Sequence, residues 1–168
     1  FADLGRCRVA AVADLDPAKL AVARRRLPAV HTTTDFDELL NDPSIDAIVI
    51  ATPVRTHFDL ALAALRAGKH VWIEKPMTET SIQARRLIAE ADRRNLTLQV
   101  DHTFLYTGAV RKMGEIIASG DLGRVLYYDS TRVNLGLFQH DVNVISDLAV
   151  HDFSILDYLL KDHPAAVT

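Results

Sequence analysis

Cysteine, tryptophan and long hydrophobic runs are scarce in this sequence of 168 residues, which holds one cysteine and one tryptophan. The single cysteine, Cys7, excludes an internal disulfide, so nothing points to an oxidising compartment and we expect a cytoplasmic protein. Its apolar stretches are far shorter than the ~18 residues of a spanning helix, which argues against a membrane protein. The 19 lysines and arginines are balanced by 22 acidic residues, which argues against a nucleic-acid surface.

The sequence does hold 49% hydrophobic residues at a net charge of −3, which excludes a disordered chain. Short apolar runs alternate with amphipathic helical patterns, as in βαβ units around a parallel sheet. Strands are predicted over residues 8–13, 30–34, 46–52, 70–73 and 96–100, and helices over residues 17–26, 35–40, 56–67 and 80–94. The run 46–52 is apolar on both faces, which predicts a strand buried in the middle of the sheet.

The pattern changes near residues 101–107, where we place a domain boundary. A helix over 109–119, an alternating strand over 125–134 and a long helix over 143–160 are predicted beyond it. We therefore expect a partial, doubly wound Rossmann-type dinucleotide-binding domain over 1–103 and the start of an α+β domain over 104–168.

Both ends of the sequence look cut. Residues 1–5 read as the tail of a helix, and residues 164–168 read as the entry into a strand. No G-x-G-x-x-G loop occurs in the sequence. Counting back from the strand that ends near residue 13, such a loop and the first strand of the sheet would precede Phe1.

Asp14 follows the first predicted strand, where an acidic side chain in a dinucleotide fold binds the ribose hydroxyls and favours NAD over NADP. The alternative is that Asp14 merely begins the turn into the helix at Pro17. The residues around Asp14 do not decide between the two.

Lys75 follows the strand over 70–73, at the carboxyl end where open α/β sheets bind their ligands. Its amine could stabilise an alkoxide that develops on a reacting hydroxyl. The alternative is an ordinary surface pair with Glu74.

Asp147 and His151 lie four residues apart on a predicted helix and therefore share a face. A carboxylate near an imidazole raises its basicity and fixes its orientation. The alternative is an exposed pair that contributes only a few tenths of a kcal/mol. Asp152 lies nearer the apolar face and is interpreted as structural. These residues show no compact three-ligand spacing, so we expect no metal site.

Together these residues resemble the Gfo/Idh/MocA family of NAD(P)-dependent oxidoreductases, which act on sugars, cyclitols and nucleotide sugars. The likeness lies in ATPVRTHFDLALAALRAGKHVWIEKPM, VDHTFLYTGAVRKM and SDLAVHDFSILDYLL, and it extends over the whole chain, about the middle half of a family member. The sequence departs from many members at two positions, with Val54 in place of asparagine and Ala149 in place of glycine.

The resemblance implies that Lys75 contacts the substrate hydroxyl and the nicotinamide ribose, that His151 is the acid/base, and that Asp147 orients His151. It also implies a further substrate contact at Tyr106. The cofactor contacts that it implies for NAD are Asp14, Thr52, Pro53, His57 and Glu74.

The resemblance further implies a dehydrogenase that transfers hydride from a secondary hydroxyl of a sugar or nucleotide sugar to NAD, with NADP the less favoured cofactor. The segment 126–152 is most similar to enzymes of nucleotide-linked sugars. A homo-oligomer is expected from the family. The alternatives are a non-catalytic NAD-binding or sugar-sensing protein on the same fold, or a plain interaction domain.

Overall fold

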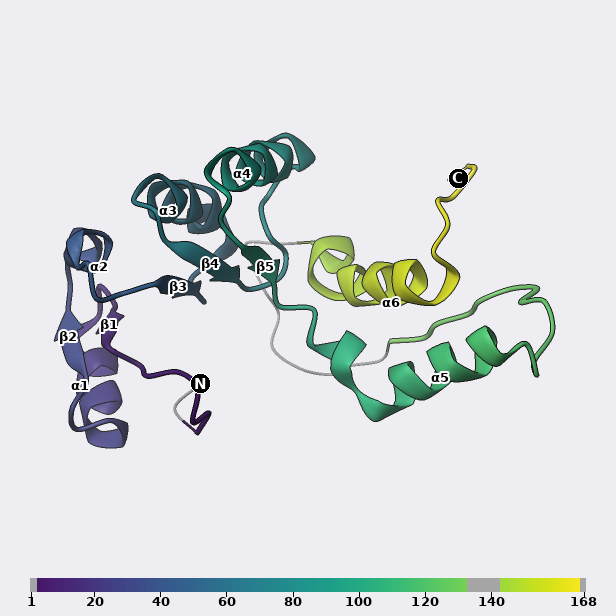
Figure 1. Ribbon diagram of the computed structural model, residues 1–168, viewed down its shortest axis with the longest axis horizontal. Helices are drawn as coiled ribbons and strands as arrows, with labels where there is room; N and C mark the ends of the chain where they lie inside the picture. The colour runs from purple at the N-terminus through teal and green to yellow at the C-terminus, as the bar shows by residue number, and fades with distance from the viewer. Residues whose placement is uncertain (1–2, 133–142, 167–168) are drawn as a thin grey trace.

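Strands and helices alternate through the first hundred residues of the computed structural model, which describes residues 3–132 and 143–166 (Figure 1). The elements are β1 (Ala11–Ala13), α1 (Pro17–Arg26), β2 (His31–Thr33), α2 (Phe36–Asn41), β3 (Ala47–Ile50), α3 (Val54–Arg66), β4 (His70–Ile73), α4 (Ser81–Arg94) and β5 (Leu98–Val100). Every ladder between them is parallel. The predicted α/β class is therefore confirmed. β4 has the predicted bounds, and the other four strands are shorter than the apolar runs that predicted them.

The strands form two sheets, in the orders β1–β2 and β3–β4–β5. In the described residues no ladder joins β1 to β3. In the strand order 3-2-1-4-5-6 of a doubly wound fold, one further strand would stand between these two. The observed pairing fits that order, and the further strand stays an expectation.

Helices α3 and α4 lie side by side on one face of the β3–β4–β5 sheet (Figure 1). The apolar core forms between these layers, and its most deeply buried members are Ala61, Ala64, Leu65, Val71, Ile73 and Leu87. The expectation that β3 is buried on both faces is wrong. Its side chains alternate between buried and exposed, and Val49 is 50% exposed because no described helix covers that face of the strand.

A buried lysine ties the beginning of β4 to the loop that precedes β3. The Nζ atom of Lys69 donates to the carbonyl oxygens of Asp42 at 2.6 Å and Ile45 at 2.8 Å, and the residue is only 7% exposed. Since a buried ammonium group is costly unless it is hydrogen-bonded, these two carbonyls explain how a cation is tolerated there.

The helix ends agree with the sequence in two places and differ in a third. Thr80 and Gln83 form a capping box at the start of α4, as the predicted helix over 80–94 requires, and Gly68 ends α3 with φ +80°, a conformation that favours glycine. α3 begins at Val54 rather than at Thr56, because Pro53, which has no N–H to lose, occupies the helix start. The Thr56 hydroxyl donates to the Pro53 carbonyl at 2.7 Å.

The second part of the chain contains the 3-10 turn η1 (Thr103–Tyr106), α5 (Gly108–Ser119), the π-helical turn η2 (Ile145–Ala149) and α6 (Val150–Leu160). Helices α5 and α6 pack together through Val110, Ile155 and Leu159 (Figure 1). The long predicted helix is therefore present, with a wide turn at its beginning.

Three predictions about irregular segments are wrong. Residues 125–132 form no strand, since no described strand lies alongside to supply hydrogen bonds, and Leu126 and Tyr127 are 77% and 85% exposed. Residues 133–134 of that predicted strand lie outside the described residues. Residues 3–5 form a turn rather than a helix tail, and residues 164–166 form no strand. Residues 1–2 and 167–168 of these two predictions lie outside the described residues.

The accessible surface of the chain is 12112 Å². A compact protein of this size exposes about 8,200 Å². The excess agrees with two separate sheets and a half-exposed β3. Among the described residues, no helix is both long and apolar enough to cross a membrane.

Candidate active site

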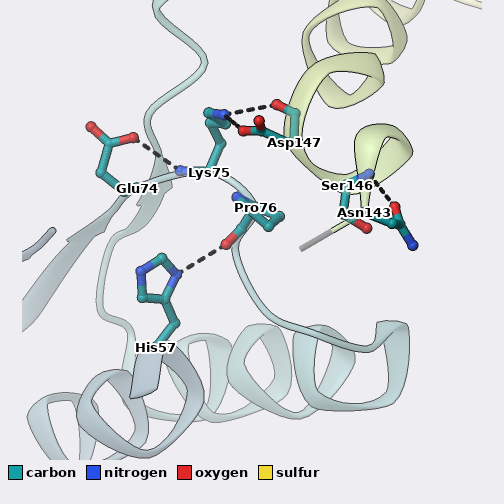
Figure 2. Close-up of polar contacts among 7 residues, drawn as sticks. All are labelled: His57, Glu74, Lys75, Pro76, Asn143, Ser146 and Asp147. Carbon is teal, nitrogen blue, oxygen red and sulfur yellow. Dashed lines mark hydrogen bonds and ion pairs between the residues drawn. The ribbon is translucent and has the colours of Figure 1, made fainter. Parts of the chain in front are cut away.

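Lys75 lies in the turn that follows β4 and reaches the π-helical turn η2 (Figure 2). Its Nζ atom donates to Oδ1 of Asp147 at 2.8 Å and to the backbone oxygen of Asp147 at 2.7 Å. An ammonium group has three donors, so these two bonds leave one donor without a partner within residues 3–132 and 143–166. The two side chains are 20% and 29% exposed, which places the pair at the edge of the protein interior.

Asp147 holds Lys75 rather than His151, which differs from the predicted carboxylate–imidazole pair. No hydrogen bond joins Asp147 to His151 in the described residues. The prediction assumed α-helical spacing, whereas Ile145–Ala149 is a π-helical turn. Its i→i+5 pattern is wider than an α-helical turn, so residues four apart no longer stand one above the other.

His151 is 8% exposed at the beginning of α6. Its ring meets Phe104 edge-on, with 4.7 Å between the ring centroids, and its Nδ1 atom is buried without a hydrogen-bond partner in the described residues. Burial lowers the pKa of His151, and the charges of Lys75 and Arg132 lower this pKa further. A neutral imidazole of this kind can accept a proton at neutral pH.

His57 connects the ends of β3 and β4 from below (Figure 2). The ring is 1% exposed, with Nδ1 at 3.0 Å from the carbonyl oxygen of Pro76 and Nε2 at 2.8 Å from that of Thr52. Both partners are backbone carbonyls, which accept hydrogen bonds. The structure thus gives His57 a scaffolding contact, and its predicted cofactor contact stays a prediction.

The other predicted cofactor residues stand at strand ends. Asp14 follows β1, and its carboxylate accepts from the backbone N–H of Asp16 at 2.9 Å and lies 3.5 Å from Nζ of Lys19. Thr52 and Pro53 are exposed after β3. Glu74 accepts from the backbone N–H of Lys75 at 3.2 Å.

The hydrogen-bonding groups of these residues are compatible with a bound dinucleotide. The Asp14 side chain is 31% exposed, and its carboxylate retains acceptor positions for ribose hydroxyls. Lys75, near the end of β4, has one donor without a partner among the residues that the structure describes. Tyr106 is 56% exposed under the guanidinium of Arg111, and no described contact joins it to Lys75 or His151. Its role toward a substrate stays a prediction.

Sequence reasoning missed two polar residues near His151, His102 and Arg132, and interpreted Asp152 as structural without identifying its partner. His102 follows β5, its Nδ1 atom is buried without a partner in the described residues, and burial lowers its pKa. The rule that located Lys75 at a strand end would also have located His102. Arg132 and Asp152 form an ion pair with Nε and Oδ2 2.6 Å apart, and nothing in the local pattern signals it. No group of three metal-ligating side chains is present in the described residues, 3–132 and 143–166.

A comparison with protein families matches residues 2–102 to the Gfo/Idh/MocA oxidoreductase family, described as having an NAD-binding Rossmann fold. The chain belongs to this family. It is 34% identical over 165 residues to inositol 2-dehydrogenase 2 of Saccharopolyspora erythraea, covering 96% of this chain and 48% of that protein.

Solved structures agree with the family assignment. A levoglucosan dehydrogenase in complex with NADH and levoglucosan superposes with a TM-score of 0.77 at 27% identity, covering 90% of this chain and 44% of that one. An apo scyllo-inositol dehydrogenase from Lactobacillus casei superposes with a TM-score of 0.67 at 25% identity, covering 72% and 36%. This member of the Gfo/Idh/MocA family spans less than half the length of these relatives.

The two departures from the family pattern have plain structural settings. Val54 begins α3 and is 5% exposed, so it belongs to the packed interior rather than to a polar contact. Ala149 ends the π-helical turn with ordinary helical backbone angles, φ −68° and ψ −20°, which do not require glycine.

Proposed function

We propose that this protein is an NAD-dependent dehydrogenase that oxidises a secondary hydroxyl of a polyol or sugar. The observation that carries the proposal is the joining of Lys75 and Asp147, because it brings a strand-end cation together with the helical segment that carries His151. Relatives named as inositol and levoglucosan dehydrogenases support the substrate class.

Each residue has one task in this proposal. The third N–H of Lys75 donates to the substrate hydroxyl and stabilises the alkoxide as it develops. Asp147 holds the Lys75 amine in place. His151, whose pKa is lowered by burial, accepts the hydroxyl proton. When bound, NAD supplies the hydride acceptor, with Asp14 toward its ribose and Thr52, Pro53 and Glu74 toward its nicotinamide end.

Some finer parts of the proposal come from the resemblance. A nucleotide-linked sugar is the second candidate substrate, supported by the likeness of segment 126–152 to enzymes of that class. NADP is less favoured because the Asp14 carboxylate would repel a 2′-phosphate. Association with further copies of the chain and a cytoplasmic location complete the proposal.

The test is NADH formation with the purified full-length protein, NAD⁺ and a panel of myo-inositol, scyllo-inositol, levoglucosan and UDP-N-acetylglucosamine. Lys75→Ala should lower kcat more than ~10-fold, a loss above ~1.4 kcal/mol in transition-state stabilisation. The exposed Lys112→Ala is the matched control and should leave kcat unchanged. A Lys75→Ala enzyme with kcat within ~10-fold of wild type contradicts the assignment.

The non-catalytic alternative makes a different prediction. A sensor on this fold would quench or enhance NADH fluorescence on binding but would turn over none of the four compounds. A plain interaction domain would leave NADH fluorescence unchanged at every protein concentration.

A further inference from the structure

An ion pair joins the beginning of α6 to a segment that has no regular secondary structure. Nε and Nη2 of Arg132 donate to the two carboxylate oxygens of Asp152 at 2.6 and 3.2 Å. The hydroxyl of Ser130 donates to Oδ1 of Asp152 at 2.7 Å. Arg132 and Asp152 are 25% and 16% exposed, so solvent screens the pair only in part.

The same guanidinium has a second contact. Its central carbon lies 4.8 Å from the centroid of the Phe104 ring, at a distance typical of a cation–π contact. Phe104 in turn meets the imidazole of His151 edge-on at 4.7 Å. These contacts therefore form a continuous path that starts on α6 and returns to it, through Asp152, Arg132, Phe104 and His151.

We propose that Arg132 and Asp152 are positioning residues for His151: the ion pair holds the guanidinium against Phe104, and the Phe104 ring fixes the imidazole in the site. His151 needs such support, because its Nδ1 atom has no partner in the described residues and Asp147 is engaged by Lys75. The inference rests on the proposed role of His151 as the acid/base.

Several charged groups face His151 and enter the test. Lys75, Arg132 and His102 lower the pKa of His151, in addition to the larger effect of burial, and Asp152 raises it. Asp147 enters only through its bond to Lys75. Because the two members of the Arg132–Asp152 pair act in opposite directions, removal of one or the other should move the titration of His151 in opposite directions.

The experiment is an NMR titration of protein labelled with ¹³C at the histidine rings, with the His151 signal assigned from His151→Gln. Arg132→Met should raise the titration midpoint of His151, since a cation is lost and a carboxylate is left unpaired. Asp152→Asn should lower it. Arg93→Met, which removes an exposed ion pair on α4, is the matched control and should leave it unchanged.

A merely structural pair gives another result. Loosened packing would hydrate the imidazole in both variants, so both midpoints would rise, and this outcome overturns the proposal. Unchanged midpoints in both variants overturn it as well. If Arg132→Met does not fold, Arg132→Lys replaces it. That variant keeps the charge, so the titration midpoint of His151 should stay near the wild-type value. The ring-current shift that Phe104 imposes on the His151 signals should change. An unaltered ring-current shift contradicts the proposal.

Kinetics separate this inference from the proposed function. With whichever compound of the panel is oxidised, Arg132→Met and Asp152→Asn should lower kcat about 10-fold with KM within about twofold, and Arg132→Lys should restore part of the loss. Opposite NMR shifts without any turnover in the wild type would retain the positioning pair and refute the dehydrogenase. Turnover by the wild type, together with His151 midpoints that move in the same direction in both variants, would retain the dehydrogenase and refute the positioning pair.

Discussion

Lys75 and Asp147 are 72 residues apart in the sequence, yet Nζ of Lys75 lies 2.8 Å from Oδ1 of Asp147. This ion pair joins the turn after β4 to the π-helical turn before α6, and so connects the two parts of the chain. The second bond of Lys75, to the backbone oxygen of the same residue, fixes the direction of the amine. An amine held by two bonds loses little freedom when it donates its third hydrogen to a ligand.

Loss of the Asp147 carboxylate should therefore misplace Lys75. We expect Asp147→Ala to lower kcat/KM at least ~10-fold, or ~1.4 kcal/mol. Asp157→Ala, at an exposed position of α6, is the matched control. Steady-state NADH formation measures both variants, and equal rates would show that the pair does not position the amine.

Loss of the His57 ring should destabilise the fold as well as the site. His57→Ala removes two buried hydrogen bonds and leaves a cavity at the ends of β3 and β4. We expect a loss of about 3 kcal/mol in the free energy of unfolding, measured by urea denaturation. His163→Ala, at an exposed position, should change it by less than ~0.5 kcal/mol. A loss of similar size in both variants would deny His57 its scaffolding role.

The stability of the protein should fall as the pH falls below about 6.5. His102 and His151 have pKa values lowered chiefly by burial, so the unfolded chain binds protons at a higher pH than the folded one. Their contribution is complete above the unfolded value of 6.5 and is lost as the pH falls toward the folded values.

Denaturation at a series of pH values checks this expectation. His151→Gln should flatten the change between pH 7.5 and 5.5, and His163→Gln should not. Glu90 titrates outside this window, since its hydrogen bonds to Arg93 and Arg94 lower its pKa to about 2. An unaltered slope in His151→Gln would contradict the assigned direction.

The 168-residue chain by itself should fold marginally and bind dinucleotide poorly. β1 and β3 share no ladder in the described residues, and the accessible surface is about half as large again as that of a compact protein of this size. Thermal unfolding followed by circular dichroism and NADH fluorescence titration measure the two properties. A cooperative transition together with micromolar NADH affinity would refute the prediction.

The sequence was sufficient for the α/β order and for the position of Lys75 after a strand, because short apolar runs that alternate with amphipathic patterns indicate strands and helices. The catalytic role of Lys75 stays a prediction. It was not sufficient for the partner of Asp147. Helical spacing implied His151, whereas the π-helical turn redirected the carboxylate to Lys75. Hydrogen-bond patterns of that kind leave no trace in hydrophobic periodicity.

Two other features lay beyond sequence reasoning for related reasons. The alternation over residues 125–132 resembles a strand, but a strand also needs a neighbouring partner, and alternation says nothing about one. The Arg132–Asp152 pair joins an irregular segment to a helix 20 residues away, so the helical pattern that contains Asp152 gives no sign of its partner Arg132.

The buried amine of Lys69 offers an internal reporter of sheet opening. Two of its three hydrogens are donated to the carbonyls of Asp42 and Ile45 and the residue is 7% exposed, whereas Lys19 and Lys112 are largely exposed. An amine-directed acylating reagent should therefore label Lys19 and Lys112 at once and should reach Lys69 only after β4 separates from the loop before β3. The rate of labelling at Lys69 thus measures that separation in the intact protein, without a substrate or a cofactor.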